Sequence, residues 1–341
     1  QSSRVTLLPT FKVSFSGIVA TRLEGNLKST IKKNVTYTFL NKKSALDSVA
    51  LIRFRKFITL NKINTIHAHG SSYFFAVLLK LTMPSIKVFW HDHFGNRVNA
   101  KNNYFLLRIF SVFFTGVFTV NEALKNWAQQ KLWVKPVLFL SNFTLESDEE
   151  VPITILKGTH GKRIVFLANL HHPKNHLLAL QSFFKSQIAS KGYSLHLIGK
   201  DKEDQYSIDV KHFITNNDLN ESVFMYGSCN DISAILKQAS IGILVSSYEG
   251  FPVTLLEYGM ANLAVVCTNV GYCNTIIQNE KTGYLVPPDN VELLTQCFIE
   301  MVNEPNRNAV LAKNLNTFVK INYAPEKVIH TIINAYQKND E

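Results

Sequence analysis

Residues 241–262, IGILVSSYEGFPVTLLEYGMAN, predict a strand, a turn and a helix in succession. The apolar run 241–245 is typical of a fully buried strand, and Pro252 stands where a proline is tolerated in the first turn of a helix. The helix expected at 253–262 is apolar on nearly all sides, so we expect it to be buried. The turn therefore lies at the carboxyl end of a strand, where open α/β sheets bind ligands.

Two glutamates stand at this turn and helix. Glu249 lies in the turn, and Glu257 lies inside the helix between Leu256 and Tyr258. Burial of an unpaired carboxylate costs several kcal/mol, and the flanking sequence offers no cation. We therefore expect both carboxylates to face one binding site. The alternative is a purely structural pair, with one glutamate on a loop and the other in a polar network.

The motif EGFPVTLLEYGMA resembles the signature of retaining GT-B glycosyltransferases of family 4, the glycosyl transferases group 1, of the type that makes bacterial cell-surface polysaccharides. The resemblance implies an α/β protein with two Rossmann-like, doubly wound domains facing a cleft. It also implies that Glu249 and the backbone of Gly250 and Phe251 contact the donor sugar. Glu257 is then expected to hold the ribose hydroxyls, and the amides near Val253 to stabilise the diphosphate.

The same resemblance divides the chain into three parts. Residues 1–145 form the acceptor-side domain, 160–323 the nucleotide-sugar domain, and 324–341 a helix that crosses back to the first domain. Family members open with a strand and a Gly-Gly turn, whereas residues 1–10, QSSRVTLLPT, contain no glycine. We therefore expect this opening element to be missing or divergent.

Short apolar runs alternate with helical patterns along the chain, which predicts parallel sheets with crossover helices. In the first half we expect strands at 14–20, 35–40, 65–69, 87–91, 116–120 and 137–141, and helices at 24–31, 47–60, 73–81, 103–114 and 121–131. In the second half we expect further strands at 163–168, 194–198, 223–226 and 263–268, and a last helix at 325–337.

Two histidine pairs, His67-Ala-His69 and His91-Asp-His93, stand at or just beyond the ends of expected strands. Side chains two residues apart on a strand point the same way. One interpretation is a metal site, as in hydrolases that begin with H-x-H on a strand. The resemblance instead places His91 near the donor sugar and diphosphate, where an imidazole can donate a hydrogen bond. We predict a catalytic role for His91. His67, His69 and His93 are more often structural or acceptor-side, and we assign them no role.

Lys174 is a further predicted site residue. It lies in the segment NLHHPKNH, residues 169–176, which matches the place where the family carries an arginine and a lysine. The resemblance implies that Lys174 stabilises the leaving diphosphate, a role in which two cations are usual. Asn169 replaces the arginine, and His171 is a possible substitute. The alternative for Lys174 is an ordinary surface lysine. The chain has no D-x-D motif, so we predict no metal at the diphosphate.

The charge of the chain is divided unevenly. Residues 1–145 contain 20 Lys and Arg against 4 Asp and Glu, whereas the remainder contains 16 against 21. A basic half predicts contact with a polyanionic surface, such as anionic lipid headgroups or a lipid-diphosphate acceptor. The alternative is a scattered, solvated face. Nucleic acid fits the charge alone, but no nucleic-acid motif is present.

The location follows from three further features. The four cysteines have no metal or disulfide spacing, which favours a reducing cytoplasm. No segment is a convincing membrane span, and the first residues do not resemble a signal peptide. We expect a cytoplasmic protein, peripheral on the inner face of the cell membrane.

The predicted function is therefore transfer of a hexose from a UDP- or GDP-type sugar to a lipid-linked or cell-surface glycan, with retention at the anomeric carbon. No cofactor is expected. Two alternatives stay open at this point. One is a metal-dependent hydrolase that uses the His-x-His pairs, and the other is a sugar-nucleotide-binding protein without catalytic activity.

Overall fold

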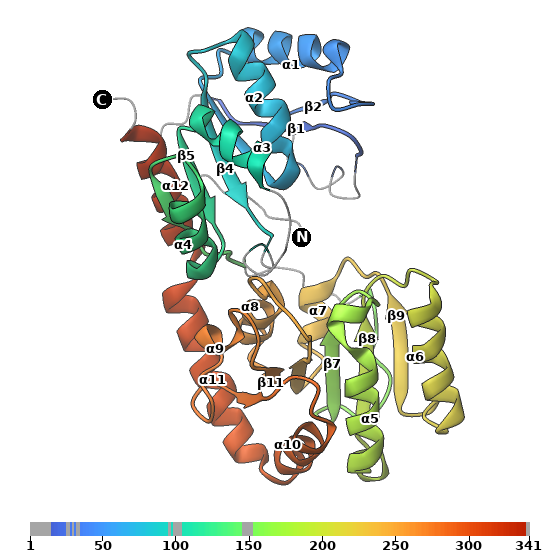
Figure 1. The fold of residues 1–341 in the computed structure, drawn as a ribbon. Coiled ribbons are helices and arrows are strands. Elements are labelled where there is room, and N and C mark those ends of the chain that lie inside the picture. The colour runs from blue at the N-terminus through green and yellow to red at the C-terminus, as the bar shows by residue number, and fades with distance from the viewer. Residues whose placement is uncertain are drawn as a thin grey trace. The chain divides into compact units, whose positions relative to one another are not determined.

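The computed structural model describes residues 15–24, 28, 31, 35–94, 97, 104–144 and 153–338. The chain forms two compact units (Figure 1). The first unit combines Gln1–Ser141 with Pro325–Glu341, and the second spans Asn142–Ala324. Two predicted features lie wholly or mostly outside the described residues. These are the opening residues 1–10 and the helix at 24–31.

The strands in the described residues of the first unit form two parallel sheets, where the predicted Rossmann-like domain has one. Strands β1 (Gly17–Ala20) and β2 (Thr36–Phe39) pair with each other. The second sheet has the order β3-β4-β5-β6, with bounds Thr65–His69, Lys87–Asp92, Gly116–Thr119 and Val137–Phe139. The helices are α1 (Ser48–Leu60), α2 (Tyr73–Thr82), α3 (Phe105–Phe110), α4 (Glu122–Lys131) and α12 (Pro325–Gln337).

Local signals in the sequence explain where these helices begin. The Asp47 side chain accepts a hydrogen bond from the Ala50 amide at 2.9 Å and caps α1. The Asn121 side chain does the same for α4, with the Leu124 amide at 2.8 Å. Helix α12 is linked to the sheet of the first unit by Tyr336, whose ring centroid lies 4.9 Å from that of Phe89.

The second unit is a six-stranded parallel sheet of order β12-β11-β10-β7-β8-β9. In chain order the strands are β7 (Arg163–Leu167), β8 (Ser194–Ile198), β9 (Val223–Gly227), β10 (Ile241–Leu244), β11 (Ala264–Thr268) and β12 (Tyr284–Val286). The helices are α5 (His176–Ser186), α6 (Gln205–Asn216), α7 (Ile232–Leu236), α8 (Val253–Met260), α9 (Cys273–Ile276), α10 (Val291–Asn303) and α11 (Pro305–Asn322).

The strand order of the second unit reverses between β7 and β10. The chain runs outward from β7 to β9 and then returns to place β10 on the other side of β7. In open α/β sheets such a switch point creates the crevice in which ligands bind. The loops that follow β7 and β10 therefore define the candidate site.

Tyr258 holds α8 against the sheet at this switch point. Its buried hydroxyl donates to the carbonyl oxygens of Ile243 (3.0 Å) and Val165 (3.3 Å) and accepts from the Leu167 amide at 2.8 Å. The ring packs over Gly242, where an added Cβ would lie 2.6 Å from a ring carbon. One tyrosine thus joins α8, β7 and β10.

Most predicted elements match the described ones within two or three residues. The strand at 65–69 and the last helix at 325–337 match in full. The helix expected at 103–114 is instead α3 followed by a 3-10 turn, Ser111–Phe113. Within the described ranges, no helix has both the length and the apolar character that crossing a bilayer requires.

Candidate functional site

The site is built from the loops after β7 and β10. The Ser247 amide donates to the carbonyl oxygen of Pro173 at 2.9 Å, which ties the second loop to the first. Pro173 belongs to a short 3-10 turn, His172–Lys174, that ends at Asn175 in the left-handed conformation. This contact brings Lys174 close to the turn that carries Glu249.

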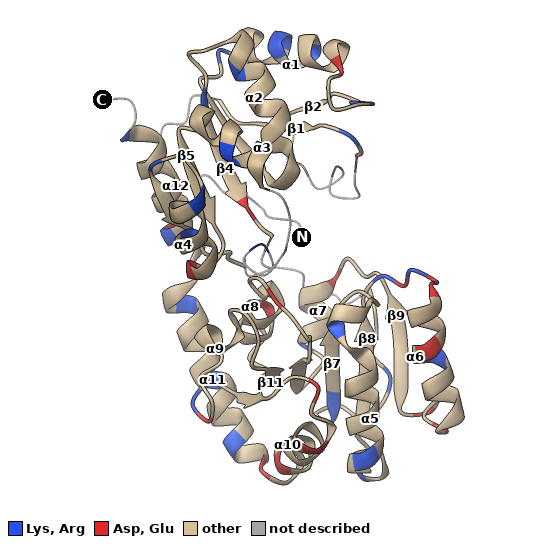
Figure 2. Cartoon of the chain, viewed as in Figure 1, with Lys and Arg blue, Asp and Glu red and all other residues tan. Residues whose placement is uncertain are grey.

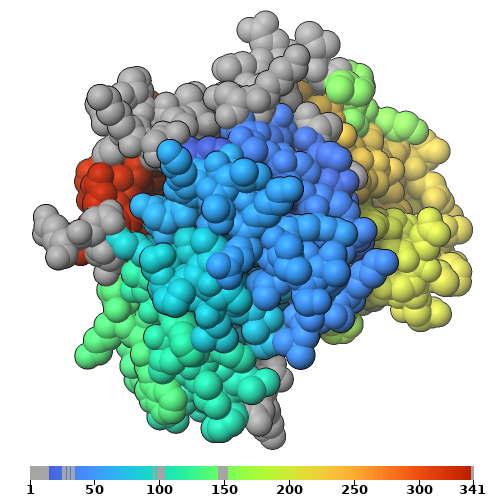
Figure 3. Space-filling model, turned by 90° about the horizontal axis from the view of Figure 1, so that it is seen from above, coloured from blue at the N-terminus to red at the C-terminus, as the bar shows by residue number. Residues whose placement is uncertain are grey.

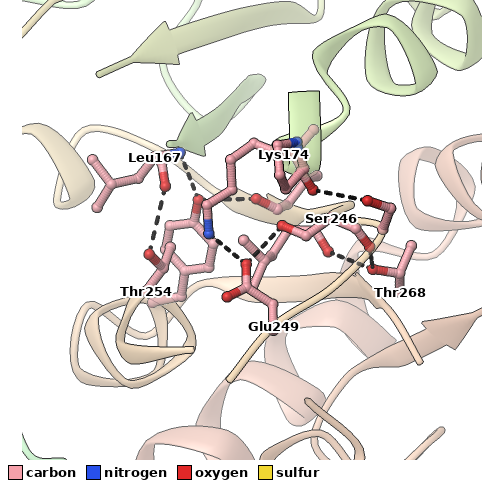
Figure 4. A network of polar contacts seen from close by, with 11 residues as sticks. Leu167, Lys174, Ser246, Glu249, Thr254 and Thr268 are labelled. Atoms are coloured by element: carbon pink, nitrogen blue, oxygen red, sulfur yellow. Dashed lines mark hydrogen bonds and ion pairs between the residues drawn. The ribbon is translucent and has the colours of Figure 1, made fainter. Parts of the chain in front are cut away.

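Lys174 and Glu249 form an ion pair at the centre of the site (Figure 4). Lys174 Nζ lies 2.5 Å from Glu249 Oε1, and Ser246 Oγ donates to the same oxygen at 2.7 Å. The side chain of Glu249 is 9% exposed and that of Lys174 is 24% exposed. Thr268 Oγ1 donates to the carbonyl oxygen of Ser246 at 2.6 Å and fixes the start of the turn. The sequence predicted both charged residues but not their pairing.

Gly271 is a positioning residue that the sequence analysis missed. Its φ is +53°, and an added Cβ would lie 1.8 Å from the carbonyl oxygen of Glu249. The loop after β11 therefore presses directly on the backbone of the turn. The only sequence signal was the Asn-Val-Gly segment just after a predicted strand.

Glu257 lies on α8 and is half-buried. Burial raises the pKa of its carboxyl. Within the described part of the chain, the structure gives this carboxylate no hydrogen-bond or ion-pair partner. The contact of Glu257 with the ribose hydroxyls stays a prediction. A carboxylate without a protein partner can accept hydrogen bonds from a ligand.

The remaining residues of the motif shape the same turn. Phe251 is buried and stacks on Tyr272, with ring centroids 5.1 Å apart. Val253 is the first residue of α8, and its amide donates to the carbonyl oxygen of Phe251 at 3.1 Å. Gly250 joins Glu249 to Phe251 within this turn.

Asn169 and His171 flank the site on the β7 loop. Asn169 Oδ1 accepts from the Lys200 amide at 2.8 Å, so Asn169 braces the loops after β7 and β8 against each other. Burial, and then the nearby Lys174, lower the pKa of His171. The replacement of the usual arginine by His171 stays a prediction.

His91 lies in the other unit, at the end of β4. It is 6% exposed, and burial lowers its pKa. His67, His69 and His93 surround it. The four histidines thus lie together in the first unit, whereas Lys174 and Glu249 pair in the second unit. The contact of His91 with a donor sugar stays a prediction.

Residues 148–317 match the family described as Glycosyl transferases group 1. This part of the chain belongs to that family. The match contains Lys174 and the whole EGFPVTLLEYGMA motif, so the second unit is a group 1 glycosyltransferase domain.

Curated relatives of this glycosyltransferase domain are distant. A UDP-Gal:alpha-D-GlcNAc-diphosphoundecaprenol alpha-1,3-galactosyltransferase of Escherichia coli is 26% identical over 107 residues, which are 31% of this chain and 27% of that protein. An uncharacterized glycosyltransferase of Haemophilus influenzae is 22% identical over 217 residues, or 62% of this chain and 58% of that protein. The chain thus matches less than two thirds of the length of either relative.

Solved glycosyltransferase structures resemble the whole fold. Anabaena Alr3699/HepE in complex with UDP and glucose has a TM-score of 0.81 at 12% identity, covering 94% of this chain and 91% of that one. A glycosyltransferase from Rickettsia africae has a TM-score of 0.74 at 16% identity, covering 94% and 89%. The predicted α/β fold of GT-B type is confirmed.

Proposed function

We propose that the protein transfers a hexose from a UDP- or GDP-sugar to a hydroxyl of a lipid-linked or cell-surface glycan, with retention of the anomeric configuration. The observation that carries this proposal is the Lys174–Glu249 pair at the switch point of a sheet that belongs to the glycosyl transferases group 1. Retention and membership of family 4 rest on the motif EGFPVTLLEYGMA.

The ion pair suggests how the site handles the donor. Lys174 is neutralised by Glu249 before a ligand binds. A diphosphate carries more charge than one carboxylate, so it competes for the ammonium group when the donor binds. Lys174 then stabilises the charge that develops on the leaving diphosphate, and the amides at the start of α8 assist it. No metal is assigned to this step.

The two glutamates and His91 take separate roles in the proposal. Glu249, released in part from Lys174, orients the donor sugar together with the Gly250 and Phe251 backbone. Glu257 accepts hydrogen bonds from the ribose hydroxyls. His91 donates a hydrogen bond to a donor oxygen as a neutral imidazole. The acceptor hydroxyl attacks the anomeric carbon from the face that the leaving group occupies. Its proton passes to an oxygen of the nucleoside diphosphate, which leaves with the electrons of the broken bond. We assign no protein nucleophile.

Support for a lipid-linked acceptor comes from the named substrate of the E. coli relative, a sugar-diphosphoundecaprenol. The first unit offers a matching surface on α1. Val49, Ile52 and Leu60 are exposed, and the exposed basic residues Arg53 and Lys56 lie among them. Figure 2 shows basic residues on this helix, and Figure 3 shows the first unit seen from above the view of Figure 1. We propose that this face rests on an anionic membrane.

The test of this function is donor turnover. We expect the protein to release nucleoside diphosphate from one UDP- or GDP-hexose, and we expect Glu249→Gln to lower that rate about 100-fold or more, the range for loss of one electrostatic contact in a transition state. Nucleotide affinity should not fall, because Glu249→Gln removes the carboxylate that competes with the diphosphate for Lys174. Glu292→Gln, which removes a carboxylate paired with Lys185 on the exposed face of α10, is the matched control.

Binding of a nucleoside diphosphate without turnover of any donor would favour the non-catalytic alternative. Equal losses of nucleotide affinity in Glu249→Gln and Glu257→Gln would contradict the division of roles between the two glutamates.

A further inference from the structure

Four imidazoles gather at the carboxyl ends of β3 and β4. The register of these parallel strands places His69 opposite His91. Side chains two residues apart on a strand point the same way, so His67 and His69 lie on one face of β3. His91, in β4, and His93, just after it, are also two residues apart. The ring centroids of His67 and His69 are 4.6 Å apart, those of His69 and His91 are 5.3 Å apart, and those of His91 and His93 are 4.0 Å apart.

The nitrogen atoms of this cluster have a separation that suits one ion. His67, His69 and His91 each offer a ring nitrogen, and these three atoms lie within 4.8 Å of one another. His67 Nε2 and His91 Nδ1 are 3.2 Å apart. Two nitrogens that bind a tetrahedral zinc ion at about 2.0–2.1 Å stand roughly 3.3 Å apart, so this pair needs little movement.

The second ring nitrogens of His91 and His67 point away from this pair of atoms. His91 is 6% exposed, and its Nε2 atom has no hydrogen-bond partner among the described residues. When Nδ1 binds the ion, Nε2 cannot bind the same ion, so it stays available to a donor oxygen. On the other side of the cluster, the Tyr336 hydroxyl lies 2.5 Å from His67 Nδ1. Metal-binding histidines typically use their second nitrogen in this way, which fixes the ring.

The residues around the cluster favour a borderline-soft cation. The nearest carboxylate in sequence, that of Asp92, is engaged by Arg97, with Oδ2 2.5 Å from Arg97 Nε. Mg²⁺ and Ca²⁺ prefer oxygen ligands, whereas imidazole suits zinc, copper and nickel. His69 and His93 are exposed, so an ion can enter from solvent.

We propose that His67, His69 and His91 bind one divalent transition-metal ion, with zinc as the cation that fits best. His93, whose Nε2 lies 2.9 Å from His69 Nδ1, or a water molecule takes the fourth position. Tyr336 from α12 supports His67 from outside the coordination sphere, so the site also joins α12 to β3. The site is independent of the proposed donor chemistry except for His91, which takes part in both.

The experiment uses the full chain without an affinity tag, after removal of metals with a chelator. Titration calorimetry with Zn²⁺ should give one ion per chain at micromolar affinity or tighter, and Co²⁺ should give the visible absorption of a tetrahedral nitrogen site. His69→Gln, at an exposed position outside the donor chemistry, should weaken zinc binding at least tenfold. Tyr336→Phe keeps the ring and should weaken it about 10- to 100-fold, as loss of an outer-sphere partner does.

His212→Gln, at an exposed histidine on α6, is the matched control and should leave the affinity unchanged. Binding only at millimolar Zn²⁺ would overturn the proposal. So would one tightly bound ion that persists unchanged in both His69→Gln and Tyr336→Phe, because the ion would then lie elsewhere. Neither result depends on donor turnover, so failure of this site and failure of the proposed function are distinguishable.

Discussion

Glu249 and Lys174 neutralise each other where solvent is largely excluded, and this pairing explains how a 9% exposed carboxylate is tolerated. The sequence placed both residues in the site but could not predict the pair. They are 75 residues apart, and their contact depends on the Ser247–Pro173 backbone bond between two loops. Local sequence patterns do not encode such a loop-to-loop contact.

Gly271 gives a test at the residue scale. Gly271→Ala places a Cβ against the Glu249 carbonyl at a positive φ, so we expect it to lower the free energy of unfolding by about 2 kcal/mol or more beyond the ordinary cost of the backbone conformation. Gly227→Ala is the control, because Gly227 also has a positive φ (+67°) but nothing within 4 Å of an added Cβ. Denaturant unfolding followed by circular dichroism measures both. Equal losses in the two variants would refute the close contact.

At the scale of the element, the apolar residues of helix α1 divide between the core and the exposed face. Basic and aromatic residues are interleaved along this helix, so Phe54 and Phe57 fit either shallow insertion into a membrane or the core of the first unit. The structure places Phe54 in the core, where it is 5% exposed and stacks on Phe75 with ring centroids 6.0 Å apart. Phe57 also packs against the core of the first unit. The exposed apolar residues are Val49, Ile52 and Leu60 instead.

The proposed membrane contact of α1 predicts binding that depends on charge. Each basic residue near an anionic surface contributes about 1 kcal/mol, so Lys56→Glu should weaken binding to anionic liposomes about tenfold or more. Lys313→Glu, at an exposed position on α11, should have little effect. Co-sedimentation at low and high salt measures this, because screening shortens the attraction. Binding that is indifferent to lipid charge and salt would count against the contact.

Strand β8 makes the second unit sensitive to acid. His196 is fully buried between Ser194 Oγ (2.8 Å) and the Tyr226 hydroxyl (3.1 Å), and burial lowers its pKa to about 4. Burial also lowers the pKa of His176 to about 4. An unfolded histidine titrates near 6.5, so the unfolded chain binds more protons between pH 6.5 and 4. The stabilisation from each neutral histidine is complete above pH 6.5 and is lost as the pH falls toward 4.

We therefore expect the free energy of unfolding of the second unit to fall by roughly 1–3 kcal/mol per buried histidine across that range. His196→Gln should flatten part of the fall, and His212→Gln should not. Urea unfolding at a series of pH values measures the slope. A wild-type slope of zero between pH 6.5 and 4 would be inconsistent with neutral, buried histidines.

At the scale of the whole molecule, strand and helix positions were largely predictable because each strand is a short apolar run and each helix is periodic. The motif at residues 249–261 predicted the GT-B fold and most of the candidate site. The sequence could not predict that β1 and β2 form a separate sheet, because pairing between strands depends on tertiary contacts. For the same reason it did not predict that Tyr336, from the far end of the chain, contacts His67.

The central claim is that the second unit binds a nucleoside diphosphate with Glu257 on its ribose. The most direct test is titration calorimetry of UDP, GDP and ADP against the wild-type chain and Glu257→Gln. We predict that UDP or GDP binds with one site per chain. Glu257→Gln should weaken that binding by about 1–3 kcal/mol, or roughly 5- to 150-fold, the range for hydrogen bonds to a charged group. Absence of binding by all three nucleotides, or unchanged affinity in Glu257→Gln, would contradict the account.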